Sequence, residues 1–463
     1  MGAGRWLMIE DALFTVEPFE AKELGNASFL VADPDAKVAV VVDPFRDVDP
    51  YLTHAEHHGF KVLRALDTHT HNDFISGARE LKALAGSAMD PLEPEQEIAL
   101  GSLTIRALHT PGHTPDHKSY LVIEGGKPKA LFSGGAVMVG GTARTDLFGP
   151  HLAAHLGLES LRTLQVRLRG LPDEVAVYPT HGSGSFCGIS GGAGHSTTLG
   201  AERLTNPYFT TTEVMGFLAR ILDQHRYPTY YAEMGELNTK GMRLVGRRPD
   251  PPKPLKAQEV AALKDEGAAI VDVRAGRDYD RGHIPGSYSI ALLPDEAFSA
   301  WVGWLIDRDR RIVLAGGSDR LHREAQLQLL RIGFDNIAGA LDGGMDAWQA
   351  SGGPLSTFET AGIEDMARMI ISGEEVTVVD ARDDHEWGSG HVPGAIHMYV
   401  PDVPHHAHDV PRHAPVAVHC GVGYRAGIAA SLLEQAGLTR IIHVNAPFDD
   451  WAGKLHLAET VPS

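Results

Sequence analysis

Short apolar runs, each followed by a polar or glycine-containing loop, recur along the 463 residues of the chain. The clearest run of the N-terminal half covers residues 37–43, and residues 270–274, 378–382 and 416–418 are similar runs in the C-terminal half. Apolar runs of this length favour buried β-strands, and functional side chains are expected in the loops that follow such strands. The pattern therefore predicts an α/β protein.

The C-terminal half contains an internal repeat. Residues 270–274 and 282–287 recur 108 residues later with similar sequence, and Trp348 and Trp451 end the two copies in matching contexts. Each copy is long enough to fold by itself. We therefore predict two successive α/β units built on one plan.

The repeat divides the chain into four parts. We expect an N-terminal domain over residues 1–246, a linker over 247–256, and the two repeat units over 257–353 and 360–463. The linker is rich in proline and lacks apolar periodicity, which is typical of a semi-rigid connection. A chain of this length exceeds what one hydrophobic core usually serves, so several domains are expected.

The second copy carries a cysteine where a thiolate can be stabilised. The loop after residues 416–418 begins at Cys420 and ends at Arg425, and a helix is expected over residues 426–435. The residues in between are Gly421, Val422, Gly423 and Tyr424. Backbone N–H groups of such a loop and the N-terminus of the next helix favour an anion, which lowers a cysteine pKa below its free value of about 8.5. We expect Cys420 to be a nucleophile and Arg425 to hold an anionic substrate, because a cysteine that only packs would not explain the glycines and the arginine around it.

The first copy lacks this cysteine. In an alignment without gaps, Arg320 matches Arg425 and Ala315 takes the place of Cys420. Nucleophilic sulfur chemistry needs a thiol, so we interpret the first copy as a catalytically inactive scaffold or docking module. Binding of a small anion by its glycine loop stays open as an alternative.

The N-terminal domain carries histidines at the ends of predicted strands. His69 and His71 follow an apolar run, and alternate residues of an extended strand end project to the same side. His113 and His181 lie in loops punctuated by glycine and proline. Several imidazoles at loop ends can bind a transition metal, although chance pairs are expected in a chain with 25 histidines.

Charge and composition limit the partners. The formal net charge of −19 argues against nucleic acid and anionic membranes, because both need basic patches. Residues 1–14 are interrupted by charged side chains, and no apolar stretch of membrane-spanning length follows. Two cysteines far apart in sequence fit a reducing compartment. We expect a cytoplasmic protein, and self-association into a homo-oligomer stays open.

The loop at Cys420 resembles the active-site loop of rhodanese sulfurtransferases, which carry sulfane sulfur as a cysteine persulfide. Residues 378–382 and 390–395 are similar to motifs of that family at the same spacing. Cysteine-dependent phosphatases also place a cysteine and an arginine at the ends of such a loop, but with five intervening residues, whereas here there are four. The resemblance implies two rhodanese-like α/β domains with parallel sheets, of which the second is active.

The N-terminal domain resembles the metallo-β-lactamase superfamily, whose fold is an αββα sandwich. That superfamily has the metal motifs His-x-His-x-Asp-His and Pro-Gly-His, then an aspartate and a final histidine. The matching residues here are His69, His71, Asp73, His113 and His181. The region is most similar to the persulfide dioxygenases, especially those fused to rhodanese domains, and residues 143–146 and 181–187 add to the match.

Two residues depart from the superfamily pattern. Phe74 stands in place of the last histidine of the first motif, and Gly135 stands in place of the aspartate that binds metal. In the persulfide dioxygenases one Fe(II) is held by two histidines and that aspartate. The resemblance therefore implies one divalent metal on His69 and His113 with a substitute third ligand.

Several substitutes are open. His71 would give a three-histidine site, and Asp73, Asp146 or His181 are further candidates. Fe(II) is favoured, Zn(II) is the alternative because three histidines also suit water activation, and an empty site is a third outcome. Cys187, Arg144 and Tyr230 are candidates for sulfur relay or substrate contact, although a buried thiol and an interface tyrosine are common structural roles.

The resemblance implies an enzyme of sulfur metabolism. The metal domain would oxidise a low-molecular-weight persulfide, such as glutathione persulfide, to sulfite with O₂, and the Cys420 persulfide would exchange sulfur with thiols, sulfite or thiosulfate. Two alternatives for the N-terminal domain remain: a zinc thioester hydrolase of the glyoxalase II type, and a metal-free binding module that serves the sulfurtransferase.

Overall fold

The computed structural model of the protein divides into two compact units. It describes residues 6–9, 12–189, 192, 194–211, 213–294 and 296–448. The N-terminal unit comprises residues 1–250 and 329–333, and the C-terminal unit comprises residues 251–328 and 334–463. The division after Asp250 falls inside the predicted linker, 247–256.

The N-terminal unit contains two β-sheets that enclose one apolar core. A four-stranded sheet has the order β1-β2-β3-β4, a six-stranded sheet has the order β12-β10-β8-β7-β6-β5, and β11 and β9 form a small ribbon. The strands are β1 (Thr15–Ala21), β2 (Asn26–Asp33), β3 (Val38–Val42), β4 (Lys61–Leu66), β5 (Glu97–Leu100), β6 (Leu103–His109), β7 (Lys118–Glu124), β8 (Lys127–Gly134), β9 (Thr142–Ala143), β10 (Ala176–Pro179), β11 (Gly188–Ile189) and β12 (Thr197–Thr198). Phe29 and Val40 of the first sheet and Tyr120 and Phe132 of the second share this core.

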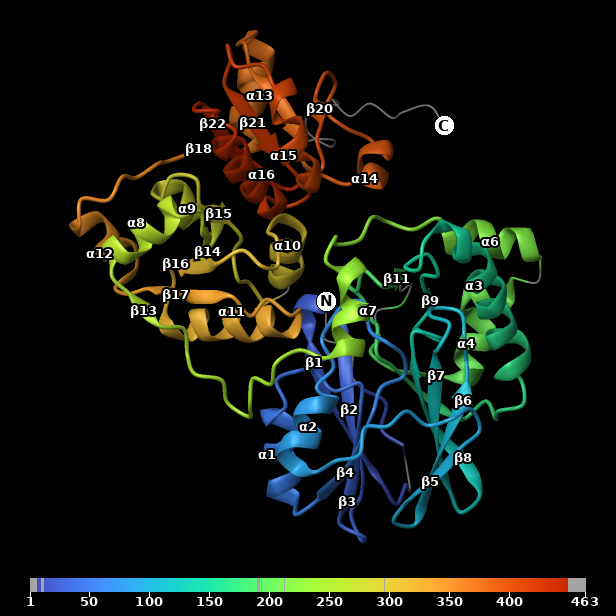
Figure 1. Ribbon diagram of the computed structural model, residues 1–463. Coiled ribbons are helices and arrows are strands. Elements are labelled where there is room, and N and C mark those ends of the chain that lie inside the picture. The colour runs from blue at the N-terminus through green and yellow to red at the C-terminus, as the bar shows by residue number, and fades with distance from the viewer. Residues whose placement is uncertain are drawn as a thin grey trace. The chain divides into compact units, whose positions relative to one another are not determined.

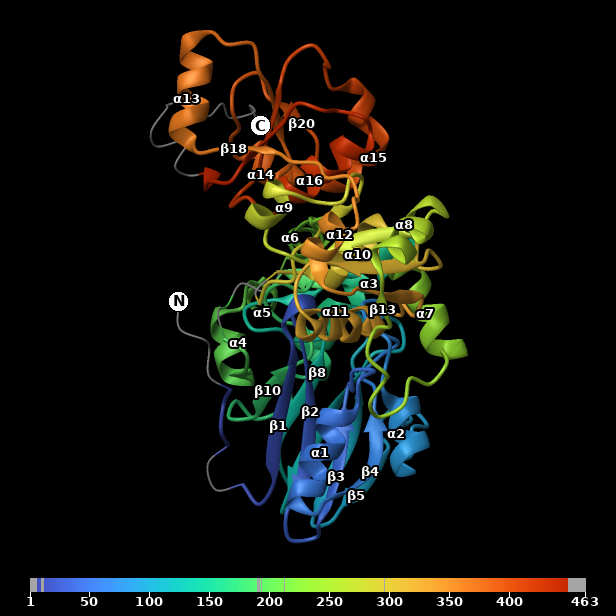
Figure 2. The same cartoon turned by 90° about the vertical axis from the view of Figure 1, so that its left-hand side faces the viewer.

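Helices cover the outer faces of both sheets (Figures 1 and 2). They are α1 (Asp49–His58), α2 (Ala78–Ala85), α3 (Pro150–Arg162), α4 (Leu199–Thr205), α5 (Pro207–Thr210), α6 (Val214–Leu222) and α7 (Tyr231–Lys240). Helices α1 and α2 contact β4, while Phe217 and Ile221 of α6 pack with Leu121 and Leu131 of the six-stranded sheet. The predicted αββα sandwich is confirmed.

Four strands of this unit end beside one another. Strand β4 leads to His69 and His71, β6 leads to the loop of His113, and β10 leads to His181. Strand β8 ends at Gly134, whose carbonyl accepts a hydrogen bond from Thr180 N–H at 3.1 Å. The polar loops that follow these strands therefore lie together and form one site.

The C-terminal unit contains two five-stranded parallel sheets of the same order, which confirms the predicted repeat. The order is β13-β17-β16-β14-β15 in the first copy and β18-β22-β21-β19-β20 in the second. The strands are β13 (Pro254–Leu255), β14 (Ala269–Asp272), β15 (Tyr288–Ser289), β16 (Ile312–Ala315), β17 (Ile337–Leu341), β18 (Glu359–Ala361), β19 (Thr377–Asp380), β20 (Ile396–His397), β21 (Val416–His419) and β22 (Ile441–Val444). Residues 254–255 of the predicted linker thus form an edge strand of the first sheet.

Strand register corrects one detail of the predicted alignment. In the second sheet His419, and not Cys420, pairs with Asp380. The partner of Asp272 at the same place in the first sheet is Ala315. Ala315 therefore corresponds to His419, contrary to the ungapped alignment.

The residue that corresponds to Cys420 is Gly316. The alignment slipped because the first-copy loop is one residue shorter, with three residues between β16 and α11 against four between β21 and α16. At the helix side Arg320 and Arg425 are both second residues of their helices, as predicted. Gly316 also lacks a thiol, so the first-copy loop still has no cysteine nucleophile.

Helix α16 is buried on nearly all sides. It begins at Tyr424, two residues earlier than expected, directly after Gly423, whose φ of 102° suits glycine. The helices of the C-terminal unit are α8 (Ala257–Asp265), α9 (Gly276–Arg281), α10 (Phe298–Leu305), α11 (Asp319–Arg331), α12 (Gly344–Ala350), α13 (Ile363–Ser372), α14 (Asp384–Gly388), α15 (Val403–His406) and α16 (Tyr424–Gln435). The end of the predicted second copy, Trp451 included, lies outside the described residues.

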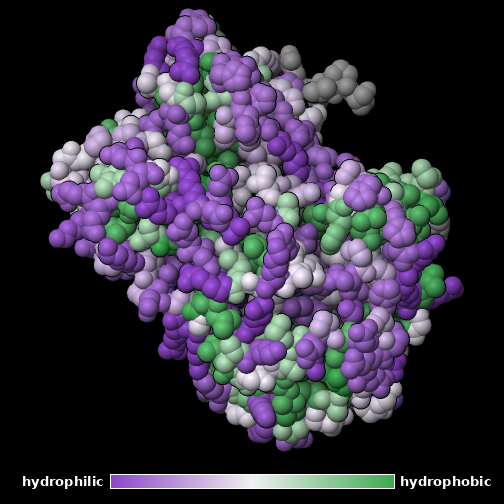
Figure 3. Space-filling model, viewed as in Figure 1, coloured by the Kyte–Doolittle hydropathy of each residue, from purple (hydrophilic) through white to green (hydrophobic). Residues whose placement is uncertain are grey.

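The surface shown in Figure 3 mixes hydrophilic and hydrophobic residues, and hydrophobic residues gather over helix α6. Val214, Met215 and Leu222 of this helix are exposed. Among the described helices, none is both long and apolar enough to cross a membrane.

Candidate functional site

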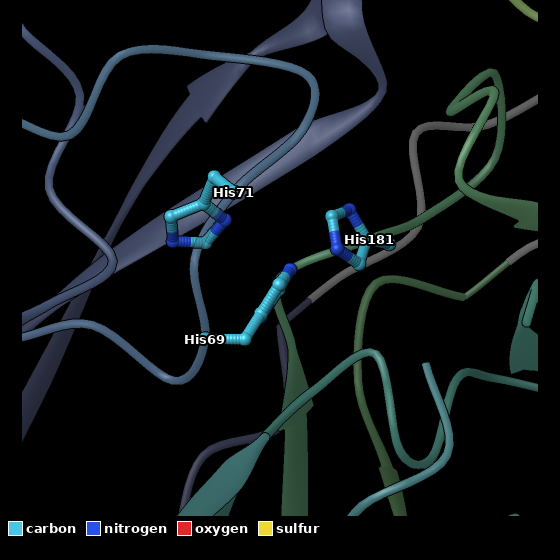
Figure 4. A group of neighbouring side chains, drawn as sticks. All are labelled: His69, His71 and His181. Carbon is cyan, nitrogen blue, oxygen red and sulfur yellow. The ribbon is translucent and has the colours of Figure 1, made fainter. Parts of the chain in front are cut away.

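Four buried histidines meet in the N-terminal unit. The ring centroids of His69 and His71 lie 4.3 Å apart, those of His69 and His113 4.8 Å, and those of His113 and His181 5.1 Å. Figure 4 shows His69, His71 and His181 gathered around one space. The strand ends that carry them therefore bring together the imidazoles that the sequence separates.

Hydrogen bonds fix the orientation of two of these rings. Nδ1 of His113 donates to the carbonyl of Arg144 at 2.7 Å. Nδ1 of His181 donates to Oδ1 of Asn26 at 3.0 Å, and the amide of Asn26 is oriented by its donation to Asp73. With Nδ1 protonated, the Nε2 lone pair of each ring is available to a metal.

Asp43 fixes the other two rings. It accepts hydrogen bonds from Nε2 of His71 at 3.1 Å and from the hydroxyl of Thr68 at 2.9 Å. The Thr68 hydroxyl in turn accepts from Nδ1 of His69 at 2.8 Å. This leaves Nδ1 of His71 and Nε2 of His69 facing the cluster.

The cluster contains nitrogen and oxygen atoms that could bind a metal and have no hydrogen-bond partner in the protein. Among the described residues, the buried atoms without a hydrogen bond include His69 Nε2, His71 Nδ1, His113 Nε2, His181 Nε2 and Asp73 Oδ1. Buried polar atoms are nearly always satisfied in native proteins. Four imidazole nitrogens and one carboxylate oxygen therefore fit a divalent metal ion.

Burial sets the protonation of the rings. It lowers the pKa of His69 and His113 well below the ordinary value, with the neighbouring histidines adding to the effect, so these rings are neutral and can bind metal. Burial also opposes the charge of His71, but the Asp43 carboxylate outweighs it and raises the pKa of His71 to about 9.

Two close groups of ligand atoms share His181. His69, His71 and His181 form one group, and His113, His181 and Cys187 form the other, each with its ligand atoms within 4.8 Å of one another. The set of His69, His71 and His113 stays a prediction. His181 takes a more central place than the sequence indicated.

The position of Gly135 is closed to a larger side chain. A Cβ atom there would lie 2.7 Å from Cβ of Ala143 and 2.8 Å from Cδ2 of His113. Asp146, one of the predicted substitute ligands, is instead paired with Arg144 at 2.6 Å.

The loop at Cys420 directs a backbone N–H group at the sulfur atom. Cys420 is buried, and Gly423 N–H points to its Sγ at 3.1 Å. The guanidinium of Arg425 forms a two-point ion pair with Glu386, in which Nη2 lies 2.7 Å from Oε1. Arg425 is therefore held at the loop by a carboxylate rather than free.

Comparison with known protein families identifies the parts of the chain. A model for rhodanese-like domains matches residues 256–351 and 363–454, and a model for the metallo-beta-lactamase superfamily matches residues 87–181. The chain joins a metallo-β-lactamase domain to two rhodanese-like domains. This confirms the resemblances of both halves.

Relatives of the metallo-β-lactamase domain include two kinds of enzyme. A hydroxyacylglutathione hydrolase of Synechococcus is 32% identical over 174 residues, which cover 34% of this chain and 64% of the hydrolase. The mitochondrial persulfide dioxygenase of Homo sapiens is 26% identical over 196 residues, covering 40% of this chain and 71% of the dioxygenase. The chain thus spans less than two thirds of the first relative's length.

A solved structure covers more than one domain. The crystal structure of a metallo-beta-lactamase from Staphylococcus aureus subsp. aureus COL is 29% identical, with a TM-score of 0.64. The match covers 71% of this chain and 99% of that chain. The metallo-β-lactamase domain is therefore shared with that protein together with part of the rhodanese-like region.

Several residues of both sites were missed by the sequence analysis. Asp43 and Asn26 orient the metal-site histidines, Nε2 of His117 accepts the N–H of Gly135 at 3.0 Å, and Glu386 holds Arg425. Asp43 had a signal, because it ends the apolar run 37–43. The others depend on contacts distant in sequence.

Tyr230 and Arg144 have structural partners. The hydroxyl of Tyr230 donates to the carbonyl of Asp73 at 3.0 Å. The side chain of Arg144 donates to the carbonyls of Phe186 and His225 in addition to its ion pair. Both side chains support the walls of the site, and their roles in substrate contact stay predictions.

Proposed function

We propose that the protein is a two-site enzyme of sulfur metabolism, with a persulfide-oxidising metal centre and a sulfur-transferring cysteine. The observation that carries the proposal is the thiol of Cys420 in a backbone loop of a rhodanese-like domain, 3.1 Å from Gly423 N–H. Such a loop stabilises an anionic sulfur atom.

Cys420 exchanges sulfane sulfur by displacement. Its thiolate attacks the outer sulfur of a donor persulfide, the donor S–S bond breaks, and the donor leaves as a thiolate. Sulfite then attacks the outer sulfur of the Cys420 persulfide, which gives thiosulfate and regenerates the thiolate. Arg425, held by Glu386, lies where it can attract the anionic donor and acceptor.

The histidine cluster would hold one divalent metal in the other domain. His69, His113 and His181 offer Nε2 atoms, and His71 would offer Nδ1 once the metal displaces the proton that Asp43 helps it retain. A bound Fe(II) would supply the redox chemistry that O₂ requires. Persulfide, O₂ and water would be consumed and thiol and sulfite released, so this domain would supply the sulfite that Cys420 uses.

A cavity beside the cluster suits a zwitterionic thiol. It has a volume of about 150 Å³ and is lined by His69 and His71. Both signs of charge are present in its wall, from Asp67, Asp116, Arg79 and Lys118. A glutathione-like substrate carries carboxylates and an ammonium group, which such a wall can pair.

Replacing Cys420 tests whether the two sites act independently. Cys420→Ser should abolish sulfur transfer from glutathione persulfide to sulfite, while O₂ consumption with glutathione persulfide continues. His69→Ala should show the converse. If Cys420→Ser also ends O₂ consumption, the two-site proposal is wrong.

The similarity to hydroxyacylglutathione hydrolases supports a second candidate activity, thioester hydrolysis at the same cluster. The two activities differ in their need for O₂. Turnover of S-lactoylglutathione by the protein under anaerobic conditions would favour the hydrolase, whereas a persulfide dioxygenase is silent without O₂.

A further inference from the structure

A two-stranded ribbon brings Cys187 to the histidine cluster. Strand β11 pairs with β9, with Gly188 opposite Ala143. One residue before the ribbon, the carbonyl of Cys187 accepts a hydrogen bond from Arg144 N–H at 2.7 Å. The side chain of Cys187 is fully buried.

The backbone of Arg144 fixes the position of Cys187 relative to His113. Arg144 donates its N–H to Cys187 and accepts Nδ1–H of His113 at its carbonyl, so one residue ties both together. The ligand atoms of His113, His181 and Cys187 lie within 4.8 Å of one another. Nε2 of His113 and Nε2 of His181 are buried without a hydrogen-bond partner, and the two residues are 2% and 0% exposed.

The usual anionic ligand has no room in this chain. Ala143, a residue of the same ribbon, and His113 fill the space into which a side chain at Gly135 would project. Asp146 is paired with Arg144.

Asp73 offers Oδ1 near His71, at 4.0 Å from Nδ1. Cys187, in contrast, has its ligand atom within 4.8 Å of those of His113 and His181.

We propose that Cys187 is the anionic donor, a thiolate ligand that replaces the carboxylate of the metal centre, with His113 and His181 as its partners. The inference rests on the metal centre of the proposed function. The thiol of Cys187 donates a long hydrogen bond of 4.0 Å to the hydroxyl of Tyr231. A purely structural thiol would not require two unsatisfied imidazole nitrogens beside it. On binding, the thiol proton is released to solvent and the sulfur–metal bond forms.

A thiolate ligand changes the metal preference of the site. Sulfur and imidazole together suit Zn(II) and Fe(II), whereas carboxylate and carbonyl oxygens suit harder ions such as Mg(II) and Mn(II). Metal–sulfur bonds are about 2.3 Å and metal–nitrogen bonds about 2.1 Å, so the three ligand atoms, which lie within 4.8 Å of one another, would move closer together on binding.

Cobalt(II) spectroscopy of the full-length protein tests the ligand directly. The metal-free protein is titrated with Co(II), and the near-ultraviolet thiolate-to-cobalt charge-transfer band is measured together with the visible bands that report bound Co(II). We expect both features in the wild type and in Cys420→Ser, the matched control that removes the other cysteine. Cys187→Ser should lose the charge-transfer band and bind Co(II) at least about tenfold more weakly.

Cys187→Asp keeps the test decisive if the serine variant does not fold. It returns a carboxylate to the site and should show the visible bands without the charge-transfer band. A charge-transfer band that survives in either Cys187 variant overturns the proposal. Visible bands without a charge-transfer band in the wild type also overturn it but leave the metal centre intact, whereas no Co(II) binding at all contradicts the metal centre of the proposed function as well.

Discussion

The two rhodanese-like copies share a scaffold down to single ion pairs. Arg274 pairs with Asp272 at 2.6 Å in the first copy, and Arg382 pairs with Asp380 at 2.7 Å in the second. Each arginine also donates to the carbonyl of a glycine eight residues further on, at 2.8 and 2.7 Å. These residues therefore serve the fold, because the copy without a nucleophile retains them.

The copies differ in the loop between strand and helix. The second copy has four loop residues, with Cys420 first, and the first copy has three, with Gly316 first. Sheet order is the same in both. The proposed sulfur chemistry would therefore depend on this short loop, whereas the rest of the domain is a scaffold that both copies share.

The largest expected effect is the complete loss of sulfur transfer in Cys420→Ser, which moving the thiol to the first copy should not reverse. Gly316→Cys placed in the Cys420→Ser background should not restore any sulfur transfer to sulfite. Gly316 has a φ of +66°, and a Cβ there would lie 2.5 Å from Oδ1 of Asp272, so the new side chain would be strained. Thiosulfate formation from glutathione persulfide and sulfite measures the result.

The single variant Cys420→Ser is the control for this exchange. Transfer by the double variant above that of Cys420→Ser would mean that a cysteine alone is sufficient and that loop length is not decisive.

Breaking the corresponding arginine–aspartate pair should destabilise the second copy more than the first. The Arg382 side chain is 5% exposed and lies 3.5 Å from the ring of Phe448, whereas Arg274 is 17% exposed. Arg382→Met leaves the buried Asp380 uncompensated, which costs about 3 to 5 kcal/mol. Arg274→Met should cost less, and denaturant unfolding of the full chain measures both.

An exposed arginine provides the control for that comparison. Arg368→Met removes a surface pair with Asp365 and should change the free energy of unfolding by less than about 1 kcal/mol. Equal losses for Arg382→Met and Arg274→Met would contradict the proposed role of burial.

Local patterns predicted the fold well where they repeat. The strands at 270–274 and 378–382 follow from apolar runs. The match of Ala315 to Cys420 was wrong because a deletion of one loop residue leaves no trace in an ungapped comparison. The pairing of Asp272 with Ala315 and of Asp380 with His419 gives the correct alignment.

The candidate metal site was only partly predictable. Histidines in strand-end loops gave the ligands, since such loops meet at one edge of a fold. The hydrogen bond from His181 to Asn26 and the proximity of Cys187 to His113 join residues that are more than 70 positions apart, and no local pattern reports such contacts. The filled space at Gly135 depends equally on the packing of Ala143.

The smallest expected effect concerns a link from the first copy to the second. His443 of β22 donates from Nδ1 to Asp280 of α9 at 2.8 Å and from Nε2 to the carbonyl of Gly423, in the Cys420 loop, at 2.9 Å. Burial opposes the charge of this ring, but Asp280 outweighs it and raises the pKa of His443. The stabilisation is therefore complete below the unfolded value of about 6.5 and is lost as pH rises through the higher folded value.

Asp280→Asn should remove this pH dependence and cost about 1 to 3 kcal/mol below pH 6.5, the usual loss for a hydrogen bond to a charged group. Denaturant unfolding across pH 5.5 to 8.5, a range of about one to two pH units on either side of the free histidine pKa, measures it. Asp278→Asn, which removes an exposed pair with Arg281 on the same helix, is the matched control and should leave the profile unchanged. If Asp280→Asn retains the wild-type slope, His443 is not the titrating group, and the first copy then contributes to the Cys420 loop only by packing.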